Sequence, residues 1–123
     1  MSVTDYIQVG KAGERFARDL LRGKDYQILV TNYRTRLGEI DIVAKKDEVF
    51  VFVEVKARVS TKFGKPYEAV TAHKFQKMKM MAEIFSQNFS LANAKKRIDV
   101  ISVELAGDLT IKNIDHFENV DLS

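Results

Sequence analysis

The chain has 123 residues, of which 46% are hydrophobic and 30% charged, a balance typical of a folded globular domain. It contains no cysteine, which excludes thiol catalysis, disulfide chemistry and cysteine-ligated zinc. The formal net charge of +3 permits a nucleic-acid partner without requiring one. No stretch has the ~20 apolar residues of a membrane span or the apolar segment of a signal peptide. We therefore expect a single domain over residues 1–123 that is cytoplasmic and makes no membrane contact.

The first half of the chain is expected to form a helix followed by three strands. Apolar residues recur at helical spacing along residues 6–22, and Gly23 then ends the pattern. The segment 26–33 predicts a first strand, and residues 37–45 and 49–57 predict a hairpin. The residues of the helix expected to face the core are Val9, Ala12, Phe16 and Leu20.

The second half is expected to add one more helix and two more strands. The only proline, Pro66, indicates a loop over residues 60–70, and helical spacing then predicts a helix over residues 71–88. Strands are predicted at 97–105 and 109–117. The order αβββαββ predicts an α/β fold, with a mixed sheet of about five strands and a helix packed on each face. The helix residues expected in the core are Phe75, Met78, Ala82 and Phe85, with Met80 and Met81 as further core filler.

The predicted hairpin carries charged residues inside the most apolar run of the chain. The segment GEIDIVAKKDEVFVFVEVKAR (38–58) places Asp41, Glu54 and Lys56 among valines, isoleucines and phenylalanines. Charged groups cost free energy to bury unless something pairs with them. A two-residue turn at 47–48 joins the strands, so the register of the hairpin determines which of these charges meet.

The register follows from the alternation of side chains between the two faces of a strand. The tight turn pairs Ile42 with Val53, and therefore Asp41 with Glu54. The same alternation places Ile40 on the face of Ile42, opposite to the acids. We therefore expect two carboxylates side by side.

Two adjacent carboxylates repel each other unless a cation lies between them. Lys56 is expected on the face of Glu54 and could neutralise one charge within a buried network, or all three residues could face water. A divalent metal accounts for the pattern better, because hard carboxylate oxygens are the ligands that Mg²⁺ prefers. A lysine beside such a metal suits water activation or charge stabilisation in phosphoryl chemistry.

The segments G-E-I-D-I-V-A (38–44) and F-V-E-V-K-A-R (52–58) resemble the catalytic core of the restriction-endonuclease-like nucleases. With KAGERFARDLL (11–21), FGKPYEAVTAHK (63–74) and RIDVISV (97–103), the pattern resembles the YraN-like family of small bacterial proteins. That family is similar to archaeal Holliday junction resolvases. The resemblance spans nearly the whole chain, and it implies a restriction-endonuclease-like core.

The resemblance also implies roles for individual residues. Metal-binding or catalytic roles fall on Glu14, Asp41, Glu54, Lys56 and the backbone carbonyl of Val55. Without the resemblance, a glutamate on a helix is an ordinary surface charge. Glu39 shares the expected face of Asp41 and could either join the metal site or cap the strand edge. Ile40 replaces the proline that often precedes the aspartate, which weakens the match to sequence-specific restriction enzymes.

Basic residues flank the hairpin on both sides. They predict a rim that contacts phosphate, and the alternative is an ordinary solvated surface. Lys74, at the start of the second helix, could likewise touch phosphate or remain solvated. His73 and His116 have no partner at ligand spacing and are expected to be incidental. The rim residues are Arg34, Arg36, Arg58, Lys62 and Lys65.

These features together predict a metal-dependent endonuclease that uses Mg²⁺ or Mn²⁺ and acts on DNA. The chain offers no long insertion to read bases in a groove, so we expect recognition of branches, junctions, flaps, ends or single strands. A non-catalytic nucleic-acid-binding module and a purely structural protein remain open. A homodimer would suit junction cleavage, and residues 109–117 are a candidate edge strand for its interface.

Overall fold

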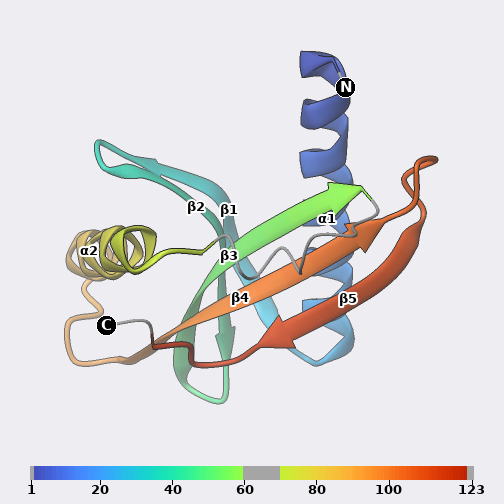
Figure 1. Ribbon diagram of the computed structural model, residues 1–123. Coiled ribbons are helices and arrows are strands. Elements are labelled where there is room, and N and C mark those ends of the chain that lie inside the picture. Colours follow the sequence, from blue (N-terminus) through green and yellow to red (C-terminus); the bar gives the residue numbers. More distant parts are fainter. Residues whose placement is uncertain (1, 60–69, 122–123) are drawn as a thin grey trace.

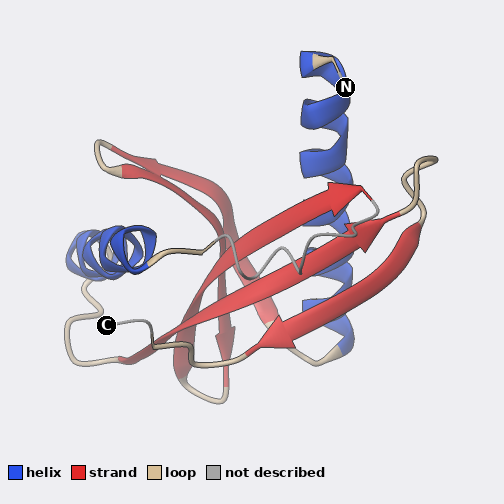
Figure 2. Ribbon diagram, in the orientation of Figure 1, coloured by secondary structure: helices blue, strands red, loops and turns tan. Residues whose placement is uncertain are grey.

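The computed structural model describes residues 2–59 and 70–121, which form two helices and one five-stranded sheet (Figure 1). The strands lie in the order β1-β2-β3-β4-β5, with β3 and β4 parallel and the other neighbouring pairs antiparallel (Figure 2). The predicted mixed α/β architecture and its element order are confirmed. In chain order the elements are α1 (Val3–Gly23), β1 (Gln27–Thr35), β2 (Gly38–Lys46), β3 (Val49–Val59), α2 (Ala72–Asn88), β4 (Lys95–Leu105) and β5 (Ile111–Phe117).

The helix α1 starts earlier than its apolar pattern indicates, because its cap is polar. Ser2 Oγ accepts the backbone N–H of Asp5 at 3.2 Å, and Asp5 Oδ2 accepts the backbone N–H of Ser2 at 3.0 Å. This reciprocal pair satisfies two backbone donors that the first turn would leave without partners. Neither helix of the described residues is long and apolar enough to cross a membrane.

The predicted core face of α1 is confirmed at Val9 and Ala12 but differs further along the helix. Phe16 and Leu20, expected in the core, are only partly buried and flank the contact. Small residues lie between them and the sheet: a Cβ added to Gly13 would meet the Cβ of Ala57 on β3 at 2.3 Å. The helix is rotated because close approach to β3 requires small residues at the contact. The buried residues of α1 are Val9, Ala12, Gly13, Ala17 and Leu21.

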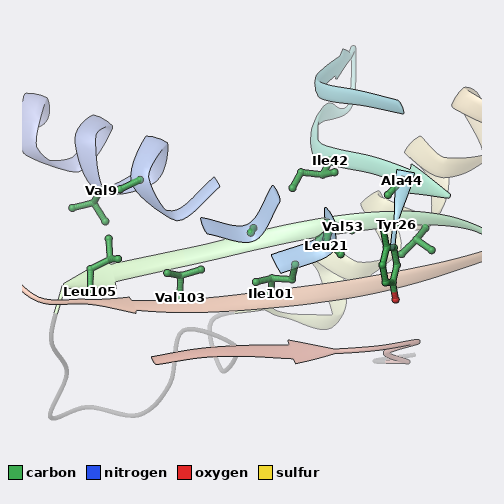
Figure 3. Packing of buried hydrophobic residues seen from close by; sticks show 12 residues of the cluster. Val9, Leu21, Tyr26, Ile42, Ala44, Val53, Ile101, Val103 and Leu105 are labelled. Carbon is green, nitrogen blue, oxygen red and sulfur yellow. The ribbon is translucent and has the colours of Figure 1, made fainter. Parts of the chain in front are cut away.

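Each helix covers a hydrophobic cluster on its own face of the sheet, as predicted. Figure 3 shows the cluster under α1, in which side chains from β2, β3 and β4 meet Val9 and Leu21. The cluster under α2 joins Val43 and Phe52 to the apolar face of that helix. Met80, which was expected as core filler, is 53% exposed and does not belong to this cluster. The α2 residues that are buried are Phe75, Met78, Met81, Ala82, Phe85 and Ser86.

The β2–β3 hairpin has the predicted register only up to Ile42. Asp47 and Glu48 both have positive φ, as a tight two-residue turn requires, and Ile42 pairs with Val53. The ladder ends there, so the predicted pairing of Asp41 with Glu54 is wrong. Beyond this point the β1–β2 hairpin curls away from β3 toward α2 (Figure 1).

The predicted alternation along β2 also breaks at Asp41. Ile42 packs under α1, whereas Ile40 packs with Phe52 under α2, so the expectation that the two isoleucines share a face is wrong. The neighbouring strand is irregular at the same level, since Asn32 has a φ of 51°. Strict alternation holds only while a strand stays flat in its ladder, and β2 leaves β3 at this residue.

Candidate metal centre

Acidic side chains converge where β2 separates from β3. Glu14 comes from the middle of α1, and Glu39 and Asp41 come from β2. Each of the three offers a carboxylate oxygen that lies within 4.8 Å of the others. We call Glu14, Glu39, Asp41 and the adjacent Glu54 of β3 the acid cluster. Four carboxylates at one point of the sheet need positive charge nearby.

Two contacts bring Glu14 to this place. The preceding residue, Gly13, lies directly against Ala57, which holds the middle of α1 close to β3. Asn32 on β1 then links the helix to the strands: its Nδ2 donates to Glu39 Oε1 at 2.8 Å and lies 3.4 Å from both carboxylate oxygens of Glu14. Sequence reasoning missed Asn32, because only the fold places it between two acids.

Asp41 lies between the two separating strands. Its Oδ2 accepts the backbone N–H of Val55 at 2.8 Å, which is the contact that replaces the missing ladder pair. Burial raises the pKa of Asp41 to about 7, and the negative charge of Glu54 adds to the rise, while the Val55 hydrogen bond opposes it. The backbone N–H of Val55 therefore contacts the acid cluster, and metal ligation by the carbonyl of the same residue stays a prediction.

Glu54 is the most buried member of the acid cluster, with 5% exposure. Lys56 Nζ lies 3.5 Å from its Oε1, and Lys74 Nζ lies 3.8 Å from its Oε2. Burial raises the pKa of Glu54, while Lys74 and Lys56 act against the rise. Within the described residues, Oε2 accepts no hydrogen bond. A buried carboxylate oxygen without a donor is costly, so this atom has capacity for a further ligand.

The donor set fits a hard divalent cation. The acid cluster supplies four carboxylates against three cations, Lys56, Lys74 and Arg34, and carboxylate oxygens are the preferred ligands of Mg²⁺ and Mn²⁺. Glu14, Glu39 and Asp41 are close enough together to share one ion. Glu54 is adjacent to this group without being part of it, and its Oε2 is the oxygen that Lys74 approaches. Lys56 is not the only cation that neutralises Asp41 and Glu54, as one alternative expected, because Lys74 also reaches Glu54.

The expected basic rim is only partly brought together. Arg34 has an 85% exposed side chain whose Nε lies 3.3 Å from Glu39 Oε2, so it borders the acid cluster. Arg36 is exposed on the same hairpin, and Arg58 is partly buried on β3. Lys74 belongs with the acid cluster through Glu54. The remaining predicted rim residues, Lys62 and Lys65, lie outside the described residues.

His116 is not incidental, contrary to the expectation. Its side chain is 2% exposed, with Nε2 2.7 Å from Asp99 Oδ2 and Nδ1 2.9 Å from Lys24 Nζ. An ammonium group can only donate, so Nδ1 accepts and Nε2–H donates to Asp99. The signal in the sequence was the Arg97–Asp99 pair, two charges on one face of a strand otherwise apolar on that face. His73 is exposed, and the structure assigns it no role.

Comparison with known proteins gives a consistent match along the chain. The family model described as "Uncharacterised protein family UPF0102" matches residues 13–103. A "UPF0102 protein" of Caldicellulosiruptor bescii is 45% identical over 109 residues, covering 88% of this chain and 92% of that protein. A relative from Thermodesulfovibrio yellowstonii is 42% identical over 113 residues, covering 92% and 95%. Another from Caldicellulosiruptor saccharolyticus is 40% identical over 112 residues, covering 91% and 95%.

Proposed function

The chain belongs to the uncharacterised protein family UPF0102, and we propose that it is a metal-dependent endonuclease that hydrolyses phosphodiester bonds of DNA. The observation that carries this proposal is the buried Glu54 beside Asp41 and two lysines, with one carboxylate oxygen that accepts no hydrogen bond from residues 2–59 or 70–121. The resemblance to restriction-endonuclease-like nucleases and to Holliday junction resolvases supports the same activity. Its cofactor would be Mg²⁺ or Mn²⁺, and its compartment the cytoplasm.

The residues of the acid cluster would hold the ion, and the neighbouring lysines would contact the phosphate. Asp41, Glu14 and Glu39 would hold the ion together with Glu54, and the ion would polarise the phosphate and lower the pKa of a bound water. Lys56 and Lys74 have side chains 33% and 37% exposed, so each can reach a phosphate at the surface. An ammonium group there stabilises the negative charge that develops on the phosphate oxygens during hydrolysis. The Val55 amide keeps Asp41 in place during the reaction.

The substrate would be recognised by its backbone and shape. The cations nearest to the acid cluster, Arg34, Lys56 and Lys74, are suited to phosphate contacts, which position a nucleic acid without reading its sequence. Branched DNA and single-stranded regions expose a phosphodiester bond that a compact site can reach. Cleavage of a junction requires two sites facing two strands, so we include a homodimer in this proposal.

The test is cleavage of branched and flapped DNA in Mg²⁺ or Mn²⁺ by the wild type and by Lys56→Ala. We expect the wild type to cut and the variant to lose cutting by a factor of about 10² or more, because a charge aimed at the transition state is removed. DNA affinity in EDTA should change little. Wild-type binding without cutting, with only modest weakening in Lys56→Ala, would identify a non-catalytic binding module instead. Absence of salt-sensitive DNA affinity would leave a purely structural role.

A further inference from the structure

Cations form a continuous ridge on the outer side of α1. Lys11, Arg15, Arg18 and Arg22 follow one another at spacings of four, three and four residues, which places them on one face of a helix. The buried residues of α1, such as Gly13, point the other way, into the sheet. With a rise of ~1.5 Å per residue, the ridge extends over about 16 Å.

Most of this charge is not neutralised within the described residues. Arg22 lies 4.0 Å from Asp19, but Lys11, Arg15 and Arg18 form no ion pair with any residue of 2–59 or 70–121. The one further acid in this part of the helix, Glu14, is linked to Asn32 at the acid cluster. The outer face of α1 is therefore strongly positive directly beside a strongly negative site.

A groove joins the ridge to the acid cluster. It has a volume of about 920 Å³ and is lined by three ridge residues, Lys11, Arg15 and Arg18, together with Glu14 and Asn32. The turn between β4 and β5 also borders it, with Leu109 and Thr110 among its lining residues. A nucleic-acid strand that leads away from the acid cluster can thus pass directly onto the cations of α1, although the groove is also lined by one further acid, Asp108.

We propose that the ridge and this groove bind the phosphodiester backbone of the nucleic-acid strand that leads away from the acid cluster, an inference that rests on the proposed function. Arginine suits this task because its planar guanidinium binds phosphate through two parallel hydrogen bonds. Such contacts read no sequence, and they release counterions from the nucleic acid, which makes affinity salt-dependent.

The experiment compares two double variants with equal loss of charge. Arg15→Gln with Arg18→Gln alters the ridge, whereas Lys79→Gln with Lys95→Gln removes two exposed lysines from α2 and the start of β4. The probe is a fluorescein-labelled forked DNA, titrated in EDTA over a range of salt concentrations. Glutamine is a good helix former, so thermal unfolding should show both variants to be folded.

We expect the ridge variant to reduce the slope of log Kd against log salt by about 1.5, since each lost phosphate contact is worth ~0.7–0.9. The control variant should leave the slope near that of the wild type. Equal slopes in both variants would contradict the proposed role of the ridge in binding DNA, and they would not bear on the proposed nuclease activity. If the wild type itself shows no salt-dependent affinity for DNA, that result contradicts the proposed function as well as the role of the ridge. Mn²⁺-induced thermal stabilisation, which reports on the acid cluster, should be the same in all three proteins.

Discussion

Asp41 reduces the stability of the metal-free fold as the pH rises. Burial next to Glu54 raises its pKa to about 7, from an ordinary value of 3.8. As the pH rises from ~4 to ~7, the unfolded chain releases this proton before the folded chain does. Folding therefore becomes less favourable over that interval, and an ion that neutralises the acid cluster would remove the effect.

We expect Asp41→Asn to be more stable than the wild type in EDTA at pH ~8, by at most about 4 kcal/mol, since each pKa unit corresponds to ~1.4 kcal/mol. Near pH 4 the difference should shrink, because the wild-type carboxyl is then protonated in the folded state. Asparagine keeps an oxygen for the Val55 N–H. Urea unfolding at several pH values measures both effects.

Addition of Mn²⁺ should reverse this order, because only the wild type can gain stability by binding the ion. Asp25→Asn, in an exposed turn, serves as the matched control and should respond to Mn²⁺ as the wild type does. If Asp41→Asn instead costs about 3–5 kcal/mol and Mn²⁺ affects neither protein, the acids are a structural network.

At the scale of elements, the position of α1 depends on a contact between two small residues. Gly13 has no Cβ, and one added there would meet the Cβ of Ala57 at 2.3 Å. That distance is too short for two carbon atoms, so a larger residue would push the helix away from β3. Glu14, the next residue, would then move away from Asn32 and Asp41.

We expect Gly13→Ala to destabilise the fold by about 1–3 kcal/mol through overpacking and to weaken Mn²⁺-induced stabilisation. Gly10→Ala is the matched control: a Cβ there meets nothing within 4 Å, so it should gain about 0.5–1 kcal/mol from helix propensity. The double variant Gly13→Ala with Ala57→Gly places the methyl group on residue 13 and removes it from residue 57. It should therefore restore the close contact and the Mn²⁺ response. A Gly13→Ala protein with wild-type stability and Mn²⁺ response would show that the contact does not position Glu14.

At the scale of the whole molecule, a buried polar network ties the end of α1 to the far strands. Asp99 on β4 accepts the Asn119 N–H at 2.9 Å and pairs with Arg97 and His116, while His116 also meets Lys24 next to α1. Burial alone would raise the pKa of Asp99, but the hydrogen bonds from His116, Arg97 and Asn119 outweigh it and lower the pKa. The ionised form is therefore favoured by folding.

We expect Asp99→Asn to cost about 3–5 kcal/mol at neutral pH, because it removes one partner of a buried charged network. The stabilisation by Asp99 is present above its unfolded pKa of ~3.9 and is lost as the pH falls through the lower, folded value. The wild type should therefore lose its advantage over the variant below pH ~4. Urea unfolding measures the difference, and a cost below about 1 kcal/mol would contradict this account.

The sequence by itself determined the local features of this protein. Helical spacing, alternating apolar residues and the tight turn at Asp47–Glu48 predicted the element order, the mixed sheet and the pairing of Ile42 with Val53, all of which the structure has. They also placed Asp41 close to Glu54, although not through the ladder pair that was expected. The elements succeed because they depend on local periodicity, and the hairpin pairing succeeds because one tight turn fixes the register of the two strands that it joins.

Only the tertiary structure decided which distant groups meet. The rotation of α1 followed from the fit of Gly13 against Ala57, and that rotation brought Glu14 to the acid cluster. The separation of β2 from β3 made the Val55 amide, rather than a ladder partner, the contact of Asp41. The burial of His116 needed β4, β5 and the end of α1 together. Such contacts depend on how complementary surfaces pack across the whole chain, and no local periodicity carries that information.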